Sequence, residues 1–145
     1  MARLRRILAP TDFSDCSIRA LEYAAELAKQ YGAEIILLHV EEPITQAALS
    51  PDLIDAVRTE QHRFAQKGIE QAAERLRATG VRVRTRLNSG LAHEQIVKIA
   101  EEHRADLIVM GTHGRSGLPH LFVGSVAETV VRTASCPVLT VKSRD

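Results

Sequence analysis

Short apolar runs separated by longer segments of helical period most constrain what this chain can fold into. The runs are rich in aliphatic and β-branched residues and occupy positions 7–9, 35–40, 81–87, 107–110 and 138–141. Such alternation of strand and helix is typical of a parallel sheet covered by helices. We therefore expect one doubly wound, Rossmann-like α/β domain over residues 1–145, because this length and an apolar content of 45% suit a single core.

The first helical segment shows its period most clearly. Its apolar residues recur at steps of three and four, at Ile18, Leu21, Ala25 and Ala28. Ser14 or Asp15 is the expected N-cap, and Gly32 is the expected end.

Three further helices are expected after it. Pro51 suits the first turn of a helix over 51–79, which is followed by Gly80. Its expected inward residues are Leu53, Val57, Phe64, Ala72 and Leu76. A third helix is expected over 92–103, and a fourth begins near Ser125 with Val126 and Val130 on one face.

Hydrophobic patterning predicts where the strands lie in the sheet. Runs 35–40 and 107–110 are apolar on successive residues, as strands covered on both faces require. Run 81–87 instead alternates apolar residues with Arg82, Arg84 and Arg86, so we expect it at an edge with the arginines in solvent.

Charge and composition argue against several classes of partner. A net charge of +1 and an aromatic content of 3% provide neither the electrostatic attraction nor the stacking that nucleic-acid binding uses. No apolar run approaches the roughly 18 residues of a membrane span, and no export signal opens the chain, so we expect a cytoplasmic protein without membrane contacts. Cys16 and Cys136 fit neither a disulfide framework nor metal-ligand spacing, which favours reduced, inert thiols.

A glycine-rich segment follows the strand at 107–110 and leads into the last helix. Its pattern is Gly-x2-Gly-x9-Gly-Ser, formed by Gly111, Gly114, Gly124 and Ser125. Unpaired amides and the dipole at a helix start favour a phosphate, and glycines allow close approach of the main chain or a positive φ. Ser125 has two open roles, as the cap of the helix or as a donor to a phosphate.

Together with three other segments, this pattern resembles the universal stress protein family in its ATP-binding branch. The residues that carry the likeness span nearly the whole chain, at 7–12, 37–40, 106–114, 124–128 and 136–139. The resemblance implies an adenine nucleotide alpha hydrolase-like fold with a five-stranded parallel sheet in the order 3-2-1-4-5. It also implies ATP, or ADP or AMP, as ligand. Mg²⁺ is expected to arrive with the nucleotide, carried by its phosphates.

The resemblance also implies a set of binding residues. Adenine is expected near Asp12 and the main chain of Val40. Ribose and phosphates are expected along Met110, Gly111, Gly114, Gly124, Ser125 and Val126. Neighbouring residues complete the candidate set, namely Pro10, Thr11, Thr112, His113 and Arg115.

Several candidates have an equally simple structural interpretation. Asp12 precedes a helix, where a turn or capping aspartate is common, and Val40 suits the core. His113 lies among turn residues, and Arg115 suits a solvated surface as well as a phosphate contact. These alternatives remain open at the level of sequence.

The function that we expect is nucleotide binding by a regulator of stress adaptation, the stress role coming from the resemblance alone. The alternatives are a slow ATP hydrolase or phosphotransferase in the same pocket, and a nucleotide-free dimeric scaffold. No catalytic residue is assigned, and the scattered histidines predict no metal site. Residues Val138 to Val141 carry too little charge for an open sheet edge, so we expect a homodimer through this strand.

Overall fold

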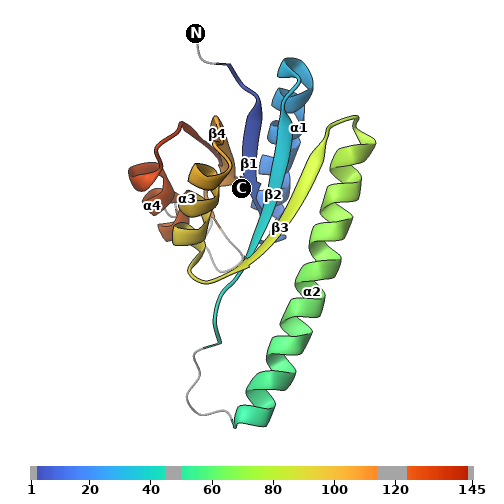
Figure 1. The fold of residues 1–145 in the computed structure, drawn as a ribbon, viewed down its shortest axis with the longest axis vertical. Helices are drawn as coiled ribbons and strands as arrows, with labels where there is room; N and C mark the ends of the chain where they lie inside the picture. Colours follow the sequence, from blue (N-terminus) through green and yellow to red (C-terminus); the bar gives the residue numbers. More distant parts are fainter. Residues whose placement is uncertain (1–2, 45–49, 114–123, 144–145) are drawn as a thin grey trace.

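A computed structural model describes residues 3–44, 50–113 and 124–143, and its centre is a five-stranded parallel sheet in the order β3-β2-β1-β4-β5 (Figure 1). The strands are β1 (Arg6–Pro10), β2 (Glu34–Glu41), β3 (Val83–Ser89), β4 (Leu107–Gly111) and β5 (Val138–Val141). This confirms the predicted strands and their order. The third strand begins two residues later than expected, at Val83 rather than Val81.

Helices cover both faces of the sheet (Figure 1). They are α1 (Asp15–Tyr31), α2 (Pro51–Ala78), α3 (Ala92–Glu102) and α4 (Ser125–Thr133). Among the described residues, none of these helices is both long and apolar enough to cross a membrane.

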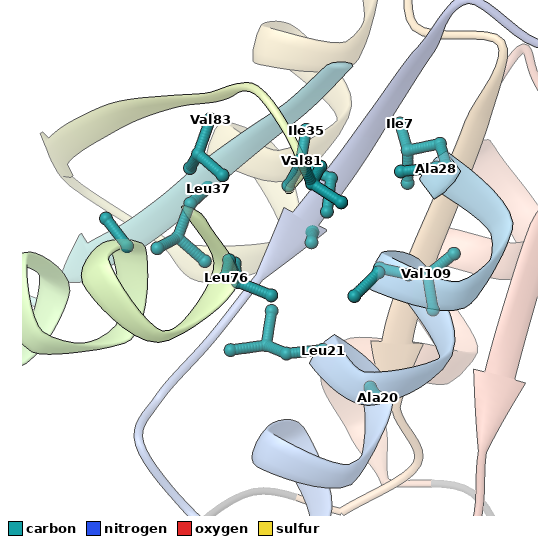
Figure 2. Packing of buried hydrophobic residues seen from close by; sticks show 14 of the residues in the cluster. Ile7, Ala20, Leu21, Ala28, Ile35, Leu37, Leu76, Val81, Val83 and Val109 are labelled. Carbon is teal, nitrogen blue, oxygen red and sulfur yellow. The ribbon is translucent and has the colours of Figure 1, made fainter. Parts of the chain in front are cut away.

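Alternate strand residues build two separate cores. Ile7 and Leu37 face α1 and α2, whereas Leu8 and Ile36 face α3 and α4. In Figure 2, Leu76 of α2 points toward Leu21 of α1 in the first of these cores. The central strands β1, β2 and β4 are buried on both faces, and for β2 and β4 the successive apolar residues predict this.

Serines and a glycine set the ends of the first two helices. Ser14 accepts a hydrogen bond from Ser17 N at 3.3 Å, so Ser14, and not Asp15, is the N-cap of α1. Ser50 caps α2 in the same way, and Pro51 occupies its first turn as expected. Gly32 ends α1 with φ 70°, a left-handed conformation that glycine adopts without steric cost.

Helix α2 contradicts part of the predicted burial. Leu53, Val57 and Phe64, which we expected to face inward, are 47%, 41% and 52% exposed. A helix of 28 residues spans about 42 Å at the usual rise, whereas β3, with 7 residues, spans only about 23 Å. The N-terminal half of α2 therefore extends beyond the sheet, and its buried residues lie in the other half, at Ala65, Ile69, Ala73 and Leu76 (Figure 1).

Helix α1 departs from its expected burial at one position. Leu21, Ala25 and Ala28 are buried as predicted, but Ile18 is 36% exposed. The buried face of the first turn is formed by Cys16 and Ser17 instead, which leaves Ile18 at its margin.

Arg84 and Arg86 of β3, with Arg82 just before it, lie at the predicted sheet edge, where they also make specific contacts. Arg82 and Arg84 are exposed, and Arg84 pairs with Glu34 of β2 at 2.9 Å. Arg86, which we expected in solvent, is half-buried instead, and it donates a hydrogen bond to Nε2 of His103 at 3.3 Å. Burial, and then the positive charges of Arg86 and Arg84, lower the pKa of His103, which favours the neutral ring that accepts this bond.

Leucine-to-alanine substitutions at the two ends of α2 test its uneven burial. We expect Leu76→Ala to lower the free energy of unfolding by about 2–5 kcal/mol, because Leu76 is 5% exposed and its loss leaves a cavity. Leu53→Ala is expected to cost about 0.5 kcal/mol or less, as surface substitutions do. Urea unfolding followed by circular dichroism measures both, and equal losses would contradict the assigned burial.

Candidate functional site

A pocket of about 510 Å³ opens at the carboxyl ends of the strands. It lies where β1 has β2 on one side and β4 on the other, so the chain order reverses at this point. Ligands of open α/β sheets bind at such a switch point, and the volume is in the range of small-molecule sites. The lining residues are Pro10, Thr11, Asp12, Ser17, Leu38, His39, Val40, Glu42, Ala92, Ile96, Met110, Gly111, Thr112, His113, Gly124, Ser125, Val126 and Ala127.

The structure brings most of the sequence-predicted candidates together in this pocket. From the ends of β1 and β2 and the turn after β1 come Pro10, Thr11, Asp12 and Val40. From the end of β4, the residues after it and the start of α4 come Met110, Gly111, Thr112, His113, Gly124, Ser125 and Val126. Gly114 and Arg115 lie outside the described residues.

Sequence reasoning missed other residues that line the pocket, among them Ser17, Leu38, His39, Glu42 and Ala92. The place of Leu38 in the pocket lining could have been predicted, because Leu38 lies on the same face of β2 as Val40. Ser17 was open to prediction too, since the start of α1 follows β1 directly. Ala92 was harder to find, because the approach of α3 to the pocket depends on tertiary packing.

Hydroxyl groups organise the turn from β1 into α1. The Phe13 N–H donates to Thr11 Oγ1 at 3.1 Å, and Ser17 Oγ donates to the Ser14 carbonyl at 2.9 Å. Each hydroxyl has one proton, so in the 2.9 Å contact between Thr11 and Ser17 the donor is Thr11. Thr11 and Ser17 are each 5% exposed, and this buried chain fixes the wall of the pocket.

Asp12 lies in this turn, and His39 of the neighbouring strand β2 bonds to the turn. Asp12 Oδ1 accepts the Ser14 N–H at 3.0 Å, so the turn role of Asp12, one of its two interpretations, is present. His39 Nδ1 lies 2.8 Å from the Thr11 carbonyl, which can only accept, so Nδ1 holds a proton. Asp12 thus has a fixed position at the pocket, as a residue that contacts a ligand requires.

Gly111 and Gly124 do not adopt the positive φ that was one of the two expected reasons for glycine at these positions. A Cβ at Gly111 would lie 2.9 Å from Cys16 Sγ and 3.1 Å from the Cys16 carbonyl carbon. A Cβ at Gly124 would lie 2.7 Å from the Thr112 oxygen, which accepts the Gly124 N–H at 2.6 Å. Neither glycine has a positive φ, so close packing against the protein itself already requires both of them.

The start of α4 differs from those of α1 and α2. Gly124, and not Ser125, is its N-cap, and among the described residues no side chain caps it. Ser125 is the first residue of the helix, and the main chain from Gly124 onward lines the pocket. The first amides of a helix have no partner within it and carry partial positive charge, so this pocket wall suits an anion.

Thr112 and His113 join this wall to β4. Thr112 is 2% exposed, and its N–H donates to the Val141 carbonyl of β5 at 2.9 Å. Its Oγ1 lies 2.9 Å from His113 Nδ1, which fixes the imidazole at the pocket. In the described part of the chain, no group of three or more His, Cys, Asp or Glu side chains could hold a metal ion.

Comparison with known proteins identifies the family. Residues 3–142 match the model of the universal stress protein family. The chain is 39% identical over 142 residues to universal stress protein MJ0531 of Methanocaldococcus jannaschii, covering 95% of this chain and 82% of the relative. The fold and the pocket define the class of this protein, which is a doubly wound α/β protein with a ligand pocket at its switch point. The family match and the identity to this relative show that the chain belongs to the universal stress protein family.

Solved structures agree with this assignment. The structure of MJ0577 from the same organism matches with a TM-score of 0.85 and 32% identity, covering 97% of each chain. The universal stress protein from Archaeoglobus fulgidus in complex with dAMP matches with a TM-score of 0.69 and 26% identity, covering 98% of this chain and 100% of that one.

Alanine at position 111 tests the packing role of this glycine. We expect Gly111→Ala to lower the free energy of unfolding by about 1–3 kcal/mol, because the added methyl group overlaps Cys16. Adding Cys16→Ala removes the sulfur but leaves the backbone contacts, so the double variant should be more stable than the two single effects predict. Additive losses in urea unfolding would show that the Cys16 sulfur is not what excludes a side chain at position 111.

Proposed function

We propose that this protein is a cytoplasmic ATP-binding regulator of stress adaptation, with nucleotide occupancy as its signal. The observation that carries the proposal is the start of α4, which has no side-chain cap among the described residues and lines the same pocket as Asp12. A relative that binds dAMP with the same fold supports an adenine nucleotide as the ligand. A ligand that favours one state of a protein shifts its population, which is how occupancy acts as a signal.

The chemistry of the pocket wall suits the two ends of a nucleotide. Leu38, Val40, Ile96 and Met110 supply apolar surface for a flat base. We place the base beside Asp12 and Val40, and the phosphates at the amides that open α4. ADP and AMP share the base and the first phosphate, and Mg²⁺ would arrive with the phosphates, held largely by them and by water.

Two hydroxyl residues of α4 test the placement of the phosphates. Ser125 lines the pocket, whereas Thr129, one turn later, donates its hydroxyl to the Ser125 carbonyl. We expect Ser125→Ala to raise the Kd for ATP about tenfold, because it removes a hydrogen bond to a charged group. Thr129→Ala is the matched control and should leave the Kd within about twofold, since surface substitutions change little.

Isothermal titration calorimetry with ATP, ADP and AMP measures these affinities. Absence of saturable binding below millimolar ATP in the unsubstituted protein would end the proposal. Chromatography of the nucleotide after long incubation separates a binding protein from a slow hydrolase, because a regulator returns ATP intact.

We further propose that two copies pair through β5. This edge strand exposes Leu139 at 37%, and the neighbouring helix α4 exposes Val131 at 52%. An open edge with apolar side chains is covered in stable proteins, and a second copy of the same strand provides a symmetric cover.

Light scattering at micromolar concentration tests the dimer. We expect twice the chain mass for the unsubstituted protein and the single mass for Leu139→Lys, because a lysine on an edge strand opposes strand pairing. Leu53→Lys on the exposed half of α2 is the control and should remain a dimer. A single chain mass for the unsubstituted protein would refute this interface.

A further inference from the structure

Phe13 has an unusual backbone conformation in the turn that lines the pocket. Its φ is 67°, and the one other non-glycine residue with a positive φ in the described part of the chain is Arg104. A bulky residue is strained in this region and stays there only where its surroundings fix it. The residue lies directly after Asp12, so whatever holds Phe13 also sets the course of the chain at Asp12.

Contacts on several sides hold the Phe13 ring. It stacks on the His39 ring with centroids 4.5 Å apart and planes 29° apart, and it meets the Phe64 ring edge-on at 5.9 Å. Against α2 the ring lies so close that a Cβ at Gly68 would be 2.7 Å from its Cζ. Because Gly68 has no side chain, the Phe13 ring can pack directly against α2 at this position.

These contacts connect to the hydrogen bonds of the pocket turn. His39, under the ring, bonds to the Thr11 carbonyl, and the N–H of Phe13 donates to Thr11 Oγ1. The next amide, of Ser14, donates to Asp12 Oδ1. Displacing the ring would thus disturb the two residues that precede it in the pocket wall, Thr11 and Asp12.

We propose that Phe13, which packs against Gly68 of α2, is a positioning residue that holds Thr11 and Asp12 at the nucleotide site. The inference rests on the proposed function, because the ligand it serves is the adenine nucleotide. Phe13 itself is not among the residues that line the pocket, so it acts through its neighbours. Helix α2, on the opposite face of the sheet from α3 and α4, thereby determines the shape of the site.

Gly68→Ala separates this role from general stability. Alanine has a higher helix propensity than glycine, so a loss of function cannot come from a lower helix propensity of α2. The added methyl group would, however, meet the Phe13 ring. Lys67→Ala is the matched control, because it places the same residue at an exposed neighbouring position of the same helix.

Two measurements are made on the full chain. Amide hydrogen exchange by NMR, without nucleotide, reports the protection of the Phe13 and Ser14 N–H groups, and calorimetry reports the Kd for ATP. We expect Gly68→Ala to speed exchange at both amides and to raise the Kd about tenfold, the effect of one lost hydrogen bond to a charged group. Lys67→Ala should leave both values within about twofold.

A double-variant cycle shows whether Gly68 acts through Phe13. With Phe13→Ala the ring is gone, so adding Gly68→Ala should change the Kd no further. Phe13→Leu keeps a narrower apolar group and is expected to give an intermediate Kd. It also supplies the test if Gly68→Ala does not fold.

The outcomes distinguish this inference from the proposed function. Unchanged exchange in Gly68→Ala, faster exchange with an unchanged Kd, or independent effects in the cycle would each overturn the positioning role of Phe13. If the unsubstituted protein binds no ATP, the proposed function fails instead. Faster exchange confined to Gly68→Ala would then still support the part of the inference that assigns Phe13 to the turn.

Discussion

The close contact between α1 and β4 is the constraint on which the pocket depends. At Gly111 the last residue of β4 approaches Cys16 of α1 so closely that no side chain fits between them. This contact brings the start of α1 close to the carboxyl end of β4, in the middle of the sheet where β1 lies between β2 and β4. The pocket is the space that remains above this contact, and its walls come from segments distant in the sequence.

The sheet could be predicted from the sequence because its patterning is local. Successive apolar residues identified β2 and β4 as central strands, and alternating arginines identified β3 as an edge. The strand order came from the family resemblance, and comparison with solved structures supports it. The burial of α2 could not be predicted in the same way, because periodicity shows which side of a helix is apolar but not where the sheet ends. Leu53 lies in the half of α2 that extends beyond the sheet and is exposed, whereas Leu76 lies in the other half and is buried.

The candidate site was predictable where motif residues follow a strand directly. Asp12, Gly111 and Ser125 line the pocket, because each adjoins the carboxyl end of a strand or the start of a helix. Their contact with a ligand stays a prediction. The reasons for particular residue types were not predictable. Gly68 has no motif around it, and the need for glycine there arises from the Phe13 ring, which reaches it from another part of the chain.

The two motif glycines also affect how relatives of this protein are classified. Gly111 and Gly124 are required by contacts with Cys16 and Thr112, which exist whether or not a ligand is present. A relative that had lost its ligand would therefore keep both glycines to preserve its fold. Divergence between ligand-binding and ligand-free members should instead appear at positions without such contacts. Ser125, exposed at the start of its helix, is a position of this kind.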